Sequence, residues 1–291
     1  MPAHTSTRSQ QRLTLPSPAK LNLFLHITGR RADGYHELQT IFQFIDYGDE
    51  LSFELTDDGS IDIAPAIAGV ALSDNLIYKA ARMVQQACGT SHGVRVGLNK
   101  ILPMGGGLGG GSSNAATTLL AVNHLWGANL SLDALAEMGL KLGADVPVFV
   151  RGEACWAEGV GEKITPIKDL AENWFVVVVP DCHVDTREIF SNKELTRDTE
   201  KCRISAALRG EGRNDCEAVV SKLYKEVAKS LNLLNNFGSA RMTGTGACCF
   251  LELQSKDQAN TVLAQLPAES KAFVARGINH SPLHTALNSQ V

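Results

Sequence analysis

The chain has 291 residues, and at roughly 150 residues per domain this length predicts two domains. Charged residues make up 20% and hydrophobic residues 44% of the chain, which is typical of a globular enzyme and not of a disordered or fibrous protein. The net charge of -4 opposes a broad nucleic-acid interface, and no apolar run approaches the roughly 20 residues that span a bilayer.

The termini and the cysteines indicate a cellular compartment. The first twelve residues are polar and lack the apolar region of a signal peptide, so we expect a loosely ordered terminus. The seven cysteines form no C-x-x-C pair, which opposes a zinc or thioredoxin-like motif. Unpaired thiols favour a reducing compartment, and a cytoplasmic location is expected.

The first half of the chain predicts strands and then helices. From residue 20 the sequence alternates, with Leu21 on one face and the polar Lys20 and Asn22 on the other, which predicts a strand with one buried face. Further strands are expected at residues 38–44, 51–55 and 94–98, and helices at 75–88, 114–126 and 131–142. After residues 144–147 we expect an apolar strand.

The second half predicts a β-α-β-β-α-β order. Strands are expected at residues 174–179, 241–243, 248–253 and 272–275, and helices beginning at residue 214 and at residue 259. Asn214 and Glu217 have the spacing of a capping box. This order is that of a ferredoxin-like split βαβ unit. We therefore expect the α+β class, with domains at residues 1–165 and 166–291.

Six glycines lie between residues 105 and 111, directly before an expected helix. Glycine loses the most backbone entropy on ordering, so such a run does not favour a strand or a helix interior. It allows close backbone approach and freely aimed N–H groups, and at a helix start these amides form an anion site. A merely flexible loop is the alternative, but it would not need so many glycines placed on a helix start.

Three common phosphate motifs fit the glycine segment poorly. The P-loop needs a lysine where Gly111 stands. Gly105, Gly107 and Gly110 formally match the dinucleotide fingerprint, but the acidic residue about 20 positions on would be Asp133, inside an expected helix. The protein-kinase glycine loop requires H-R-D and D-F-G segments, and the sequence has neither.

The segment LPMGGGLGGGSS instead resembles the P-x-x-x-G-L-G-S-S motif of the GHMP kinases. PAKLNL near the start and MTGTGAC near the end fit two further motifs of this superfamily. With RADGYHELQT, DNLI, LGADVPVF and AEGVGE, the resemblance covers nearly the whole chain after residue 13. The set is most similar to the branch whose acceptor is a cytidine-diphosphate-linked methylerythritol of the non-mevalonate isoprenoid route.

The resemblance implies a fold and a reaction. The N-terminal ATP-binding domain would be ribosomal protein S5 domain 2-like, and the C-terminal domain ferredoxin-like. ATP, as its Mg²⁺ complex, would donate its γ-phosphoryl group to the 2-hydroxyl of the acceptor, with no tightly bound cofactor and no protein metal site. We expect small-molecule substrates, no nucleic-acid or membrane partner, and a monomer or weak homodimer.

A lysine–aspartate couple of the resembled family matches Lys20 and Asp145. Asp145 would take the proton of the acceptor hydroxyl as general base. Lys20 would keep Asp145 ionised and offset charge on the moving phosphoryl group. From the residues alone, a turn aspartate and a solvated strand lysine are the plainer interpretations, and the resemblance decides between them.

The other site residues follow from the same resemblance. The expected ATP-binding residues are Pro103, Met104, Gly105, Gly106, Gly107, Leu108, Gly109, Gly110, Gly111, Ser112, Ser113, Asn75, Leu76 and Lys100. The expected acceptor-binding residues are Asn22, Tyr35, His36, Val160 and Phe190. Tyr35 and His36 would hold cytosine by stacking and hydrogen bonds, and Phe190 would cover the base. For residues 244–246 a contact near the phosphates and a plain hairpin turn both stay open.

Two alternatives remain at this point. Another GHMP kinase, such as a homoserine or mevalonate kinase, should lack the tyrosine–histidine pair of DGYHELQT. An RNA-binding protein that uses the S5-like domain is the alternative outside enzymes, and the net charge of -4 opposes it.

Overall fold

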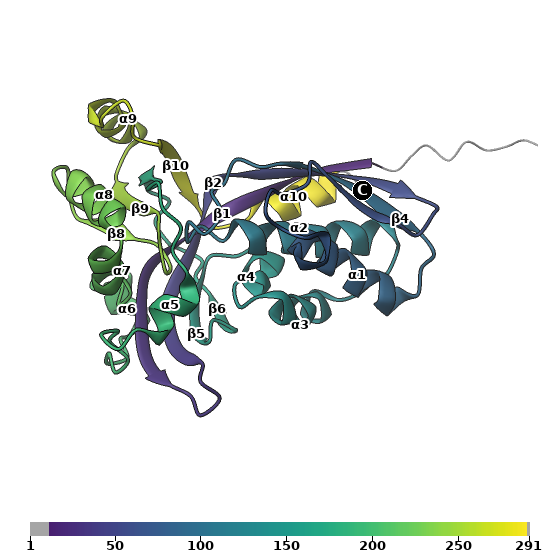
Figure 1. Ribbon diagram of the computed structural model, residues 1–291, viewed down its shortest axis with the longest axis horizontal. Helices are drawn as coiled ribbons and strands as arrows, with labels where there is room; N and C mark the ends of the chain where they lie inside the picture. Colours follow the sequence, from purple (N-terminus) through teal and green to yellow (C-terminus); the bar gives the residue numbers. More distant parts are fainter. Residues whose placement is uncertain (1–11, 290–291) are drawn as a thin grey trace, which may run out of the picture.

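The computed structural model describes residues 12–289 and arranges them in two lobes that share one sheet (Figure 1). The long strands β1 (Arg12–Arg30) and β2 (His36–Thr56) run through both lobes. Nearly all of the terminus expected to be loose lies outside the described residues. None of the helices over residues 12–289 is long and apolar enough to cross a membrane.

The remaining elements follow in chain order. The other strands are β3 (Ile61–Ala64), β4 (Gly93–Asn99), β5 (Cys155–Gly159), β6 (Lys163–Pro166), β7 (Trp174–Val178), β8 (Ala240–Met242), β9 (Cys249–Leu253) and β10 (Ala272–Ile278). The helices are η1 (Leu72–Asp74), α1 (Leu76–Cys88), α2 (Gly110–Leu125), α3 (Leu132–Leu142), α4 (Val146–Arg151), α5 (Thr186–Ser191), α6 (Ile204–Ala207), α7 (Glu217–Leu223), α8 (Lys225–Asn235), α9 (Lys256–Gln265) and α10 (Pro282–Ser289).

The sheet connects the lobes through β2. Its path is β3-β4-β2-β10-β7-β9-β8, and β1 and β5 also pair with β2. Only β3 and β4 run parallel among the described strand pairs. The two separate strands predicted at residues 38–44 and 51–55 are wrong, because β2 stays paired with β1 between them. At that point Gly48 lies so close to β1 that a Cβ there would be 2.3 Å from the carbonyl oxygen of Ser17.

The C-terminal lobe has the predicted ferredoxin-like arrangement. Strands β7, β8, β9 and β10 form an antiparallel sheet in the order β10-β7-β9-β8. The single helix and capping box predicted from Asn214 are wrong. Tyr224 is extended and separates α7 from α8, while the Glu217 carboxylate accepts from the backbone N–H of Met242 at 2.8 Å.

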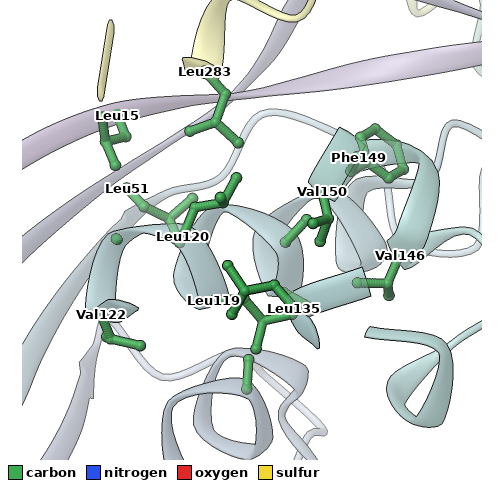
Figure 2. Close-up of a cluster of buried hydrophobic side chains, with 14 of the residues drawn as sticks. Leu15, Leu51, Leu119, Leu120, Val122, Leu135, Val146, Phe149, Val150 and Leu283 are labelled. Carbon is green, nitrogen blue, oxygen red and sulfur yellow. The ribbon is translucent and has the colours of Figure 1, made fainter. Parts of the chain in front are cut away.

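The core of the N-terminal lobe surrounds α2 (Figure 2). The buried side chains labelled there come from β1, β2, α2, α3, α4 and α10: Leu15, Leu51, Leu119, Leu120, Val122, Leu135, Val146, Phe149, Val150 and Leu283. The strand predicted after residues 144–147 is wrong. Pro147 stands in the first turn of α4. Backbone N–H groups in this turn have no partner within the helix, so proline loses nothing there, and the apolar run that follows can be helical.

The last helix returns to the N-terminal lobe, where Figure 1 shows α10 close to β1. Leu283 therefore joins the N-terminal core although it lies far beyond residue 165. The domain division at residues 165/166 stays a prediction.

Side-chain caps begin the helices α1 and α3. Asn75 accepts from the N–H of Ile77 at the start of α1, and Ser131 accepts from the N–H of Ala134 at the start of α3. Gly89 ends α1 in the left-handed conformation, with φ 64°.

The expectation of one buried face for β1 is wrong, because both faces are covered. Leu21 packs with Phe175 and Phe250 of the C-terminal lobe, and Phe24 packs with Trp156. Lys20 is only 3% exposed. A buried lysine on a strand between two lobes points to a site at this place.

Candidate active site

A cavity of about 900 Å³ opens beside β1 and is lined by both lobes. Every residue of the predicted site lines it except Ser113. Ser113 is fully buried, and its Oγ lies 2.8 Å from Ser17 Oγ, on the core side of α2. Ser112 is the serine that faces the cavity.

The glycine segment forms one wall of the cavity and begins α2 earlier than predicted. The helix begins at Gly110, with Gly109 as N-cap at φ 74°, and its first backbone bond runs from Ser113 N to Gly109 O at 2.8 Å. The amides of Gly110, Gly111 and Ser112 therefore precede that bond, in the turn where a helix carries its positive partial charge. This turn lines the cavity.

The loop at residues 243–248 packs directly against the glycine segment. Its backbone N–H groups at Ala247 and Cys248 donate to the carbonyls of Gly105 and Gly106 at 3.2 and 3.1 Å. A Cβ at Gly107, where φ is 75°, would lie 2.2 Å from Thr243 O. Residues 244–246 turn between β8 and β9 and line the cavity. A place near the phosphates or the acceptor stays a prediction.

Lys20 and Asp145 meet inside the cavity. The Lys20 ammonium lies 3.3 Å from Asp145 Oδ2, and it also donates to Asn22 Oδ1 at 2.5 Å and to Gly107 O at 3.0 Å. Asp145 is 33% exposed and makes no capping bond at the start of α4. An open carboxylate beside a buried ammonium has the geometry to accept a proton from a hydroxyl and to stabilise negative charge next to it.

Lys20 and Asn22 share one face of β1, as the alternation predicted. Both polar ends of the Asn22 amide are occupied, since its Nδ2 donates to Thr40 Oγ1 at 2.9 Å. Its backbone N–H donates to Thr243 Oγ1 at 2.9 Å.

An aromatic group lines the opposite part of the cavity. The rings of His36 and Phe190 stack with centroids 4.9 Å apart and an interplanar angle of 26°. Arg197 Nε donates to His36 Nε2 at 3.1 Å. Burial and then the charges of Arg197 and Arg30 lower the pKa of His36, which favours the neutral imidazole. Tyr35 is 66% exposed at the rim.

The residues expected on the adenine side line another part of the cavity. Asn75 and Leu76 are at the start of α1, and Met104 is 54% exposed. Lys100 Nζ lies 2.7 Å from Asp49 Oδ2, so its charge is already balanced. Val160 donates its backbone N–H to Glu162 at 2.6 Å and also lines the cavity.

Sequence reasoning missed several partners of these residues. Asp49, Arg197, Thr40 and Thr243 hold Lys100, His36 and Asn22 in place. Asp49 and Arg197 stand in no motif that the sequence analysis used. Thr40 and Thr243 lie within RADGYHELQT and MTGTGAC, but the sequence assigned them no role. Of these residues, Asp49 has the strongest sequence signal of a structural role, because it is an aspartate between two apolar parts of β2.

No group of three or more histidine, cysteine, aspartate or glutamate side chains over residues 12–289 is arranged to hold a metal ion. The Asp145 carboxylate and the Ser112 hydroxyl are among the oxygen groups that line the cavity together with the glycine segment.

The comparisons with known proteins agree with this geometry. The models of the GHMP kinases N terminal domain and the GHMP kinases C terminal match residues 75–153 and 199–272. The chain is 57% identical over 280 residues to the 4-diphosphocytidyl-2-C-methyl-D-erythritol kinase of Pseudomonas paraeruginosa, covering 96% of this chain and 99% of the relative. It is 58% identical over 281 residues to the enzyme of the same name from Marinobacter nauticus, covering 95% and 98%.

Solved structures extend the comparison. A crystal structure of 4-(cytidine 5'-diphospho)-2C-methyl-D-erythritol kinase matches with a TM-score of 0.79 and 31% identity, covering 91% of this chain and 99% of that one. A homoserine kinase from Cytophaga hutchinsonii matches with a TM-score of 0.70 but 14% identity, covering 96% and 98%, which shows the fold alone. The chain therefore belongs to the GHMP kinases, within the family of the 4-diphosphocytidyl-2-C-methyl-D-erythritol kinases.

Proposed function

We propose that this chain transfers the γ-phosphoryl group of ATP to the 2-hydroxyl of 4-diphosphocytidyl-2-C-methyl-D-erythritol, giving the 2-phosphate and ADP. The observation that carries the proposal is the Lys20–Asp145 contact of 3.3 Å in the same cavity as the first turn of α2. The Lys20–Asp145 pair supplies a cation and a base, and the first turn of α2 supplies amides for phosphate. The proposal is further supported by membership in a family of kinases.

The chemistry follows from where each group lies. Asp145 takes the proton of the acceptor hydroxyl as its oxygen approaches the γ-phosphorus atom. Lys20 stands beside the same point and offsets the negative charge that develops on the transferring group. The amides of Gly110 and Gly111 hold phosphate oxygens at the positive end of α2. The Ser112 hydroxyl and the Asp145 carboxylate could hold the Mg²⁺ ion of the ATP complex, which would neutralise phosphate charge there.

The acceptor's nucleotide part binds at the aromatic group. Phe190 and Tyr35 stack on the cytosine ring, and neutral His36 hydrogen-bonds its edge. Arg30 and Arg187 line the same end of the cavity, and neither guanidinium forms an ion pair with a carboxylate of the described residues. Two unbalanced cations beside an aromatic slot suit a nucleoside diphosphate better than mevalonate or homoserine.

An ADP-release assay with three acceptors tests the proposal. The cytidylyl acceptor should support turnover well above the rate with ATP alone, and mevalonate and homoserine should not. Turnover with either of those two and none with the cytidylyl compound would assign a different GHMP kinase activity. The cytoplasmic location and the monomeric or weakly dimeric state stay predictions.

A further inference from the structure

Thr40 lies on β2 beside Asn22, and it lines the same cavity as Lys20 and Asp145. Its exposed fraction is 1%, and its Oγ1 accepts from Asn22 Nδ2 at 2.9 Å. We propose that Thr40 is a positioning residue for phosphoryl transfer. Its hydroxyl fixes the amide of Asn22 so that the amide oxygen faces Lys20, and this holds the Lys20 ammonium against Asp145. The inference rests on the proposed function, in which Lys20 and Asp145 face the reacting groups.

The direction of the Asn22 amide is decided by the single proton of the Thr40 hydroxyl. That proton is donated to the carbonyl oxygen of Phe24, at 2.5 Å. Toward Asn22 the hydroxyl can then only accept, so it must face the NH₂ group and not the amide oxygen. A reversed amide would place two oxygens together at Thr40 and an NH₂ group 2.5 Å from the Lys20 ammonium. Both contacts would be unfavourable, so one hydroxyl selects one amide orientation.

The selected orientation completes the surroundings of the Lys20 ammonium. It donates to Asn22 Oδ1 and Gly107 O at 2.5 and 3.0 Å, and it forms an ion pair with Asp145 Oδ2 at 3.3 Å. A lysine stem has four rotatable bonds and many rotamers, so the position of its nitrogen depends on these contacts. The shortest of the three is the one that Thr40 controls.

The backbone of Asn22 is held independently of Thr40. Its N–H donates to Thr243 Oγ1 at 2.9 Å, and the neighbouring N–H of Lys20 donates to Leu108 O at 3.0 Å. Loss of the Thr40 hydroxyl therefore frees the Asn22 side chain, while these two backbone bonds of β1 remain. This separation makes the positioning role testable apart from folding.

The test compares Thr40→Val with Thr40→Ser. Valine keeps the volume and removes the hydroxyl, and serine keeps the hydroxyl. We expect Thr40→Val to lower kcat by about 10- to 100-fold, the range for a catalytic group misplaced by about 1 Å, with the KM for ATP changed much less. Thr40→Ser should restore most of kcat. A Thr40→Val enzyme with wild-type kcat, or a serine variant as impaired as the valine variant, would overturn the inference.

Thr117→Val is the matched control. Thr117 is fully buried in α2, and its Oγ1 has no hydrogen-bond partner, so the same substitution there removes a hydroxyl that positions nothing. Its kcat should equal that of the wild type. Equal losses in Thr117→Val and Thr40→Val would assign the effect to burial of valine and refute a specific role for Thr40.

A double-mutant cycle separates positioning from general destabilisation. In an Asn22→Ala background there is no amide to orient, so adding Thr40→Val should leave kcat unchanged. A further loss equal to that of the single variant would show that Thr40 acts by another route and would refute the inference. All variants are assayed with whichever acceptor the wild type phosphorylates. If the wild type does not phosphorylate the cytidylyl acceptor but phosphorylates another one, the proposed substrate is rejected. The Thr40 variants, assayed with that other acceptor, still decide the role of Thr40.

Discussion

Replacing Gly107 with alanine should weaken the contact between the glycine segment and the loop at residues 243–248. Gly107 has φ 75°, in the left-handed region that costs a residue with a Cβ about 1–2 kcal/mol. Its Cβ would lie 2.2 Å from Thr243 O and 3.0 Å from Gly246 O. Both neighbours are backbone atoms, so no change of rotamer relieves the overlap. Overpacking of this kind costs about 1–3 kcal/mol, which gives a total loss of about 2–5 kcal/mol.

Gly111→Ala provides the comparison within the same segment. Gly111 lies in the first turn of α2, its φ is not positive, and its Cβ would meet only Leu76 Cδ1 at 3.6 Å, an ordinary contact. Alanine should therefore fit and add up to about 1 kcal/mol of helix stability. The two variants differ by four positions and by the sign of the expected change in the free energy of unfolding.

Urea unfolding of the wild type and both variants measures the difference. Gly107→Ala should unfold at a clearly lower urea concentration, and Gly111→Ala at the same or a higher one. Gly107→Ala should also lower kcat, because Gly107 O accepts from Lys20 Nζ. If Gly107→Ala unfolds within about 0.5 kcal/mol of the wild type, as an uninvolved surface change would, the close approach to Thr243 O is refuted.

Three further predictions concern the site. Asp145→Asn should abolish turnover and leave ATP affinity, measured by calorimetry, nearly unchanged; wild-type turnover would remove Asp145 from the mechanism. Tyr35→Ala should raise the KM of the cytidylyl acceptor by about tenfold or more, as expected for a lost base stack, and the KM of ATP far less; equal increases would contradict the cytosine assignment. The pKa of His36 is lowered below 6.5 by burial and by Arg197, so the unfolded chain binds the proton more readily. Its contribution to stability is complete above pH 6.5 and is lost as the pH falls below that value; His36→Gln should flatten this part of a plot of Tm against pH, and an unchanged slope would exclude His36.

Local patterns predicted most of the elements but not how they join. The sequence predicted the four strands of the C-terminal lobe, with residues 244–246 between the two central ones. The sequence predicts two strands where β2 is continuous, because it does not show that Gly48 lets β1 approach closely. It predicts a strand where α4 forms, because a short apolar run looks the same in a buried strand and a buried helix.

In the site, too, the sequence predicts local segments but not the contacts between residues that are far apart in the chain. The glycine segment carries its own signal, since no other residue type allows its positive φ values and close contacts. The partners of the functional side chains carry no such signal. Arg197 is 161 positions from His36 and Asp49 is 51 positions from Lys100, and both read as ordinary charged residues until the fold brings them together.

The surroundings of Lys20 explain why the site forms only in the complete fold. Its side chain is 3% exposed, and the three groups that contact its ammonium come from different parts of the chain: β1, the glycine segment, and the segment before α4. The C-terminal lobe holds two of these parts in place, because Thr243 contacts both Asn22 and Gly107. A buried ammonium without these acceptors would be costly, so the lysine enters its position only when both lobes are assembled. The lysine–carboxylate pair is therefore set by the contact between the lobes as much as by the two residues that compose it.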